Sequence, residues 1–201
     1  MSARGAFIVV EGPNGVGKTT SAAALADHLN TVGTATLLTS EPSKGPIGTV
    51  ARAAEAALTG RVMALAIAAD RAWHLSEVIE PALAAGRHVI SDRYLPSSLV
   101  LQRLDGLDID EIWTYNAFAL PADLTFYLET DPQIIDARLN ERLHKSRLER
   151  VGSPGLELDL YDQAHEFLAA RGWRQIRIDC REKTPAELVA EMLHHLELPM
   201  D

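Results

Sequence analysis

A glycine-rich loop between an apolar strand and a helix limits the possible fold more than any other segment of this chain. The run Phe7–Glu11 is apolar and rich in β-branched residues, the loop reads GPNGVGKT from Gly12 to Thr19, and the small residues and leucine of Ser21–Leu25 favour a helix. This order is typical of a P-loop, in which backbone N–H groups and the positive end of the helix bind phosphate. The sequence therefore predicts a site for a nucleoside triphosphate such as ATP.

Individual positions of the loop have expected tasks. We expect Lys18 to reach the β- and γ-phosphates and the hydroxyl of Thr19 to bind Mg²⁺. Glycines allow conformations and close approaches that side chains obstruct. The alternative is a glycine-rich turn without a ligand, which the order of strand, loop and helix disfavours. The residues expected to bind the nucleotide are Gly12, Pro13, Asn14, Gly15, Val16, Gly17, Lys18, Thr19 and Thr20.

Charge and composition exclude several other classes of protein. The 201 residues include 19 basic and 28 acidic side chains, so the net charge of −9 disfavours general binding to nucleic acid or to an anionic membrane. The length and the 47% hydrophobic content suit one domain, expected over residues 1–201. The single Cys180 fits a reducing cytosol and argues against structural zinc. Short apolar runs predict neither a signal peptide nor a membrane span, so we expect a cytoplasmic protein.

Short β-type runs alternate with segments of helical length, which predicts an α/β fold with a five-stranded parallel sheet and helices on both faces. The expected strands are Phe7–Glu11, Ala35–Ser40, His88–Asp92, Leu124–Glu129 and Gln175–Asp179. The expected helices are about Lys18–Thr31, Ile47–Leu58, Val62–Ala85, Asp108–Ala119, Pro132–Leu143, Gly155–Ala170 and Pro185–Leu196. Ligands of such sheets bind beyond the carboxyl ends of the strands.

Two acid–arginine pairs accompany the loop. Asp92 and Arg93 leave a predicted strand together, and we interpret Asp92 as an acid near a Mg²⁺–phosphate site and Arg93 as a phosphate clamp. Capping of the next turn by Asp92 is the alternative. Asp70 and Arg71 lie inside a predicted helix, where a structural ion bridge is the alternative to a role in the site.

An arginine-rich segment near the middle of the second half stands out in an otherwise acidic chain. It contains Arg138, Arg142, Lys145, Arg147 and Arg150, and Gly152-Ser153-Pro154-Gly155 follows. We interpret residues of about 140–155 as a mobile lid whose arginines close over the triphosphate. A solvated helix face with charge pairs four residues apart is the alternative.

These motifs, with others in the same order, resemble the thymidylate kinase family along nearly the whole chain. The matching stretches are GPNGVGKTT, Glu41-Pro42, AADRAWHL at Ala68–Leu75, IEPALAAGRHVISDRYLPSS at Ile79–Ser98, Gln102, PADLTFYLE at Pro121–Glu129 and the final SRLER of the lid. The resemblance implies a P-loop kinase fold and phosphoryl transfer from Mg²⁺–ATP to a nucleoside 5′-monophosphate, dTMP above all. It also implies a homodimer.

The resemblance assigns roles to individual residues. By this likeness Lys18, Asp92 and Arg93 are catalytic, with Arg93 bridging the donor and acceptor phosphates, and Thr19 and Asp92 hold Mg²⁺, partly through water. Gly15 stands where some family members have a basic residue, so the missing charge is expected from the lid, where the candidates are Arg142, Arg147 and Arg150. The residues that would bind the acceptor are Glu41, Ile67, Arg71, Arg93, Ser97, Ser98 and Gln102.

Four departures from the family pattern fall around the acceptor pocket. An aromatic residue that stacks on thymine, a tyrosine, a basic residue and a P-loop carboxylate are all absent. Their places are taken by Ile67, Leu101, Ser40 and Asn14. Lys44 and Arg52 are available to supply the missing positive charge. A modified nucleotide or another small acceptor therefore stays open beside dTMP, as does an ATP-binding switch with little kinase activity.

Overall fold

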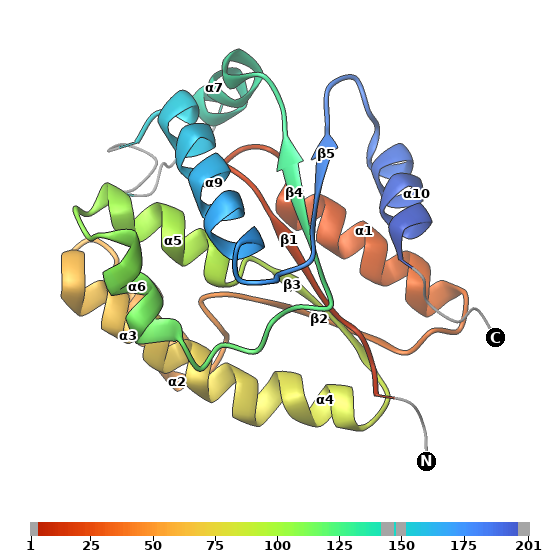
Figure 1. Ribbon diagram of the computed structural model, residues 1–201. Coiled ribbons are helices and arrows are strands. Elements are labelled where there is room, and N and C mark those ends of the chain that lie inside the picture. The colour runs from red at the N-terminus through yellow and green to blue at the C-terminus, as the bar shows by residue number, and fades with distance from the viewer. Residues whose placement is uncertain (1–3, 142–146, 148–151, 197–201) are drawn as a thin grey trace.

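The predicted parallel sheet is present and has five strands (Figure 1). The computed structural model describes residues 4–141, 147 and 152–196. All neighbouring strands run parallel in the order β2-β3-β1-β4-β5. The strands are β1 (Phe7–Glu11), β2 (Thr36–Ser40), β3 (His88–Asp92), β4 (Leu124–Glu129) and β5 (Gln175–Asp179). The predicted α/β fold is thus confirmed.

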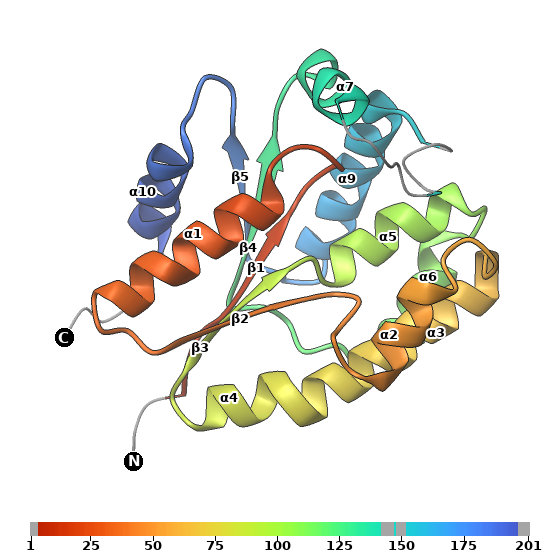
Figure 2. The same cartoon turned by 180° about the vertical axis from the view of Figure 1, so that it is seen from behind.

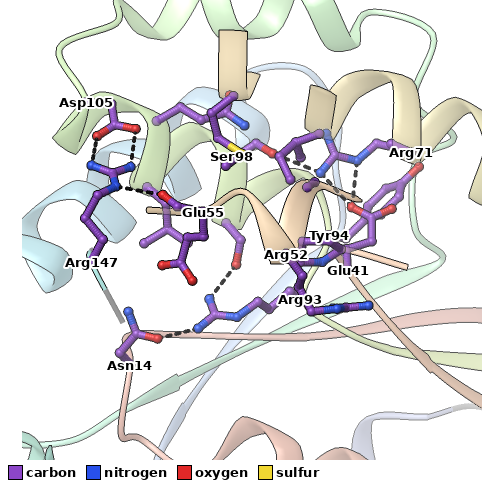
Figure 3. A pocket seen from close by; sticks show the side chains of 17 residues that line it. Asn14, Glu41, Arg52, Glu55, Arg71, Arg93, Tyr94, Ser98, Asp105 and Arg147 are labelled. Carbon is purple, nitrogen blue, oxygen red and sulfur yellow. Dashed lines mark hydrogen bonds and ion pairs between the residues drawn. The ribbon is translucent and has the colours of Figure 1, made fainter. Parts of the chain in front are cut away.

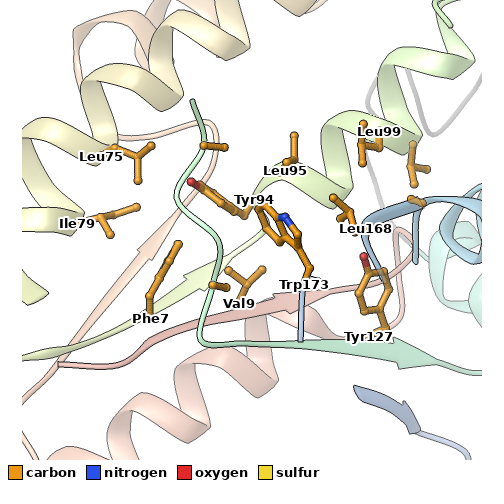
Figure 4. Close-up of a cluster of buried hydrophobic side chains, with 14 of the residues drawn as sticks. Phe7, Val9, Leu75, Ile79, Tyr94, Leu95, Leu99, Tyr127, Leu168 and Trp173 are labelled. Carbon is orange, nitrogen blue, oxygen red and sulfur yellow. The ribbon is translucent and has the colours of Figure 1, made fainter. Parts of the chain in front are cut away.

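The central strand β1 divides the hydrophobic core into two parts. Successive side chains of a strand point to opposite faces of the sheet. Phe7 and Val9 therefore join a cluster on one face that includes Tyr94 and Trp173 (Figure 4). Ile8 and Val10 join the cluster on the other face with residues of helices α1 (Lys18–Thr31) and α10 (Pro185–His195). Burial on both faces explains why β1 is a continuous apolar run and not an alternating one.

Helices cover both faces of the sheet, as Figures 1 and 2 show. Helices α1 and α10 pack together on one face, whereas α5 and α9 pack together on the other. The helices are α1 (Lys18–Thr31), α2 (Pro46–Ala53), α3 (Gly60–His74), the π-helical η1 (Leu75–Ile79), α4 (Glu80–Ala84), α5 (Leu95–Leu104), α6 (Ile109–Asn116), α7 (Pro132–Asn140), α9 (Pro154–Ala169) and α10 (Pro185–His195).

Three helix predictions need correction. The helix expected over Ile47–Leu58 ends at Ala53, and the one expected over Val62–Ala85 contains the π-helical segment η1 between α3 and α4. Helix α5 was not predicted. Most of its residues are buried, so the polar stripe that reveals a surface helix is missing from its sequence.

The strand order brings three chain segments to one edge of the sheet. Strand β3 lies between β2 and β1, and Ser40 and Val10 both pair with Asp92 in register. The segments after β1, β2 and β3, which begin with the P-loop, Glu41 and Arg93, therefore lie side by side. None of the helices in the described ranges is long and apolar enough to cross a membrane.

Candidate active site

The P-loop joins β1 to α1 with a backbone that needs glycine. Gly12 and Gly15 have φ angles of 138° and 83°, in the region that side chains disfavour. A Cβ atom at Gly12 would lie 2.4 Å from the carbonyl oxygen of Leu128, and one at Gly15 would lie 3.2 Å from Leu139 of α7. Leu139 of α7 thus leaves little room for a side chain at position 15. This gives a physical reason for Gly15 at the position where some members of the family have a basic residue.

A cavity of about 440 Å³ opens in front of this loop. Residues from Asn14 to Ser21 line it, together with Arg93, Arg138 and the segment that leads into α10. The guanidinium of Arg138 donates to the carbonyl oxygens of Gly15 and Val16, at 3.4 and 3.2 Å. Gly12 and Pro13, which were also predicted to bind the nucleotide, are not among the residues that line the cavity. The cavity therefore offers backbone N–H groups and four cationic side chains, those of Lys18, Arg93, Arg138 and Lys183, to a polyphosphate.

Lys18 is buried at the bottom of this cavity. Its side chain is 5% exposed, and its Nζ donates to the carbonyl oxygen of Pro13 at 2.8 Å. Burial above all, and then the nearby Arg93, lower the pKa of Lys18 to about 7, although the carboxylates of Asp92, Glu11 and Glu157 oppose this shift. An anionic phosphate beside Nζ would stabilise its protonated form.

Asp92 and Thr19 form a contact that fits a magnesium site. Thr19 Oγ1 donates to Asp92 Oδ2 at 2.5 Å, while the buried Asp92 Oδ1 has no hydrogen-bond partner within the described ranges. Mg²⁺ is commonly held by one or two protein ligands together with substrate phosphates and water. The described residues contain no group of three or more His, Cys, Asp and Glu side chains that could hold a metal without a substrate. Tyr94, and not Asp92, is the N-cap of α5.

Arg93 faces two cavities. Its backbone has a φ of 74°, rare for a residue with a side chain, and such strain persists only where the surroundings hold it. Its Nη1 donates to Ser97 Oγ at 2.9 Å and its Nη2 donates to Asn14 Oδ1 at 2.5 Å. Arg93 lines the P-loop cavity and also a second cavity on its other side. A phosphate in either cavity can therefore reach the same guanidinium.

The second cavity is lined by the residues that were predicted to bind the acceptor, and we call it the acceptor cavity for that reason (Figure 3). Its volume is about 270 Å³, and its walls are mainly apolar with charged groups between them. All of the residues predicted to bind the acceptor line it, namely Glu41, Ile67, Arg71, Arg93, Ser97, Ser98 and Gln102. These residues come from α3, α5 and the segments after β2 and β3. The structure thus brings together residues that are up to 61 positions apart, from Glu41 to Gln102.

Arg71 is the polar centre of this cavity. Only 1% of its side chain is exposed, and its Nε and Nη2 donate to Glu41 Oε2 at 2.9 and 2.6 Å. Nη2 also donates to Ser98 Oγ at 2.9 Å, and Nη1 donates to Asn116 Oδ1. The ion bridge considered as an alternative is present, but with Glu41. Nη1 carries two hydrogens, and within the described ranges Asn116 is the acceptor found for one of them.

Comparison with known proteins gives the family. The family model described as thymidylate kinase matches residues 10–151. The chain belongs to the thymidylate kinase family. A thymidylate kinase from Synechococcus sp. (strain JA-2-3B'a(2-13)) is 37% identical over 197 residues, which cover 92% of this chain and 91% of the relative. A probable thymidylate kinase from Thermococcus kodakarensis is 37% identical over 158 residues, 72% of this chain and 76% of the relative. A thymidylate kinase from Xanthomonas euvesicatoria is 42% identical over 142 residues, 69% and 62% of the two chains.

Three of the four departures from the thymidylate kinase pattern lie in the acceptor cavity. Ile67, Leu101 and Asn14 line the acceptor cavity, whereas Ser40 and Lys44 do not. Arg52 of α2 lines the cavity and donates through Nη2 to the carbonyl oxygen of Ser43. Arg52 thus adds a positive charge to the lining of the cavity, although Ser40 stands where the pattern has a basic residue.

One of the three lid arginines lies within the described part of the chain. Arg147 donates to both carboxylate oxygens of Asp105 at 2.6 and 2.7 Å, and its Nε donates to the carbonyl oxygen of Glu55 (Figure 3). Arg147, Asp105 and Glu55 all line the acceptor cavity. In this structure Arg147 therefore closes a wall of the acceptor cavity. Arg142 and Arg150 lie outside the described residues.

Two buried carboxylates in the site were not recognised as site residues from the sequence. Glu11 accepts from the backbone N–H groups of Tyr94 and Ser97 at 2.7 and 3.1 Å and from Ser97 Oγ at 2.7 Å, and burial raises its pKa. Glu157 of α9 accepts from the backbone N–H of Asn14 at 2.8 Å. Glu11 ends a predicted strand, at the edge of the sheet where ligands were expected, and this position was the signal that could have assigned it to the site. Nothing in the sequence around Glu157 indicates a contact 143 residues away.

Proposed function

We propose that this thymidylate kinase family member transfers the γ-phosphoryl group of ATP to dTMP, giving ADP and dTDP. The observation that carries the proposal is the position of the Arg93 guanidinium, which lines both the P-loop cavity and the acceptor cavity. An in-line transfer needs donor and acceptor phosphates to meet at one point, and a shared cation favours that meeting. The family match agrees with this arrangement.

The residues act by positioning and by electrostatic stabilisation, without a covalent enzyme intermediate. Lys18 and the P-loop N–H groups would bind the β- and γ-phosphates, and Arg93 would stabilise the charge on the transferred group. Thr19 and Asp92 fit a Mg²⁺ ion, held partly through water. When bound, such an ion neutralises charge on the phosphate oxygens. The assignment of Arg142 and Arg150 as further sources of positive charge stays a prediction from the sequence.

The apolar walls support a methylated pyrimidine as the acceptor base. Ile67, Leu101 and Met63 offer aliphatic contact in place of an aromatic face. Arg71 would present its remaining N–H to a polar edge of the base. Arg52 would lie near the acceptor phosphate or sugar. A dTMP molecule satisfies both the apolar wall and these cations, since it combines a methylated base with a phosphate.

An acceptor panel tests this function. ADP formation is measured with Mg²⁺–ATP and dTMP, dUMP, dCMP, UMP or CMP, and product masses are determined. We expect the highest kcat/KM with dTMP, about tenfold or more above dUMP, because one methyl group in an apolar pocket contributes roughly that much. Equal slow ADP release with every acceptor would instead support a nucleotide-dependent switch. Clear preference for another acceptor would overturn the assignment of dTMP.

We also propose a homodimer, as the family resemblance implies. Helices α2 and α3 pack together and carry exposed apolar side chains, with Val50, Val62 and Leu65 exposed by 63, 59 and 47%. Apolar side chains on adjoining helices suit contact with a second copy. Light scattering should give twice the chain mass of 21.9 kDa. A monomer at micromolar concentration would contradict the proposal.

A further inference from the structure

Glu157 is a buried carboxylate whose hydrogen bonds within the described residues all come from Asn14 of the P-loop. It lies in the first turn of α9 and only 3% of it is exposed. Its Oε2 accepts from the backbone N–H of Asn14 at 2.8 Å, and its two oxygens lie 3.1 and 3.3 Å from Asn14 Nδ2. A buried carboxylate needs such donors, since burial without them is costly. Glu157 therefore fixes the position of Asn14 from a helix far away in the sequence.

The side-chain amide of Asn14 has only one orientation that suits both of its neighbours. Its Nδ2 donates to Glu157, and its Oδ1 accepts from Arg93 Nη2 at 2.5 Å. An amide turned by 180° would place its oxygen against the carboxylate and its NH₂ group against the guanidinium. Neither of these contacts is a hydrogen bond. The carboxylate of Glu157 thus selects the orientation in which Asn14 can hold Arg93.

Arg93 is held in the same manner on its other side. Nη1 donates to Ser97 Oγ, and Ser97 Oγ donates to the buried Glu11 at 2.7 Å. Each Nη atom is therefore held by a neutral residue, and each neutral residue is held by a buried carboxylate. A direct ion pair with either carboxylate would compete with phosphate for the guanidinium. The neutral intermediates position Arg93 without occupying it with an anion.

We propose that Glu157 is a positioning residue for phosphoryl transfer, which acts through Asn14 to hold the Arg93 guanidinium between the two cavities. The proposal rests on the function proposed above. It also explains why this chain has Asn14 in place of a P-loop carboxylate. An aspartate at this position would bring two carboxylates to about the 3.1–3.3 Å that now separates Asn14 Nδ2 from Glu157. Like charges at this distance disfavour each other, so the amide at 14 and the carboxylate at 157 depend on each other.

Three variants and one control test the proposal. Glu157→Gln, Asn14→Asp and the double variant Asn14→Asp/Glu157→Gln are compared with Glu166→Gln, the same exchange at an exposed residue of α9. We expect Glu157→Gln to lower kcat about 10- to 100-fold with less than a threefold change in the KM for ATP, because a small displacement of a catalytic group has effects of this size. Glu166→Gln should retain wild-type kinetics.

The double variant provides the sharpest result. Asn14→Asp alone should lose more activity than Glu157→Gln, because it sets two carboxylates together. Removing the charge of Glu157 should then raise the activity of the Asn14→Asp protein at least tenfold, a non-additive outcome expected only of residues in contact. Wild-type kcat in Glu157→Gln, or no recovery in the double variant, would overturn the proposal. Loss of activity that only follows a lower melting temperature would also overturn it.

A readout that does not depend on the reaction separates this proposal from the proposed function. Hydrogen exchange of the Arg93 Nη2–H group, which donates to Asn14 Oδ1, is measured by NMR and assigned with Arg93→Lys, and it should be at least tenfold faster in Glu157→Gln than in Glu166→Gln. If the wild type forms no dTDP while this difference is present, the proposed function fails and the positioning of Arg93 stands. If the wild type forms dTDP and the exchange rates agree, the positioning role is wrong.

Discussion

Replacing Lys18 by methionine is expected to lower kcat/KM for phosphoryl transfer by about 10³-fold or more, while the folded protein becomes more stable. The loss of activity follows from removing a buried cation that would face the transferred phosphate, where charge is weakly screened. The gain in stability follows because folding removes that same charge from water. Steady-state kinetics and thermal unfolding of one preparation measure both effects.

The lowered pKa of Lys18 determines whether its replacement raises or lowers the stability of the fold. The pKa of Lys18 is lowered in the folded protein to about 7 from 10.5, so between these values folding releases a proton and stability rises with pH. Below pH 7 the charge is present in both states and its burial is fully unfavourable. Methionine removes this term, and we expect a gain of about 1–4 kcal/mol at pH 6 that shrinks as the pH rises toward 10.

The same exchange at a surface lysine tests whether the loss of activity depends on the position of Lys18 or only on the loss of one positive charge. Lys44 is exposed and lines neither cavity, so Lys44→Met should change activity less than twofold. Activity of Lys18→Met within tenfold of the wild type would show that Lys18 is not at the reacting phosphates. Loss of activity together with a lower melting temperature would attribute the effect to misfolding.

The sheet could be predicted almost completely from the sequence. Four of the five strands have the predicted bounds, and β2 begins one residue later than expected. Strands such as Phe7–Glu11 are continuous apolar runs bounded by glycine or charged residues, because both of their faces are buried. The residues of the loop, of the Asp92-Arg93 pair and of the acceptor cavity were found because they belong to motifs with fixed order. Local pattern was sufficient wherever the chemistry is carried by adjacent residues.

Contacts between distant segments could not be predicted. The sequence could not identify the partners of Asp70 and Arg71, for which a structural ion bridge was the alternative to a role in the site. The side chain of Asp70 accepts from the backbone N–H and the Oγ of Ser43, both at 2.6 Å. Adjacent residues of a helix do not face each other, so Arg71 points elsewhere and pairs with Glu41. The contact of Glu157 with Asn14 likewise depends on how α9 packs over the P-loop. Periodicity and motif order contain no information about such pairings.

Removing the Arg71 side chain is expected to destabilise the fold by about 3–5 kcal/mol, the usual effect of breaking a buried ion pair on one side. In Arg71→Ala, Glu41 would keep only His74, whose Nδ1 lies 3.3 Å from Glu41 Oε1. Asn116 and Ser98 would also lose a donor. For a chain of this length such a loss lowers the melting temperature by roughly 6–20 °C. Urea unfolding at pH 7 measures the free energy.

Two comparisons decide whether this effect belongs to the buried pair. Arg61→Ala removes an arginine whose side chain is 68% exposed and which pairs with Glu111 at 2.7 Å, and we expect stability to stay close to that of the wild type because solvent screens an exposed pair. In Arg71→Met/Glu41→Leu both charges are gone and no carboxylate stays buried without a partner, so most of the lost stability should return. The double variant should still fail to use dTMP, since the polar centre of the acceptor cavity is gone. Equal destabilisation by Arg61→Ala and Arg71→Ala would contradict the buried pair, and normal dTMP use by the double variant would remove Arg71 from the acceptor site.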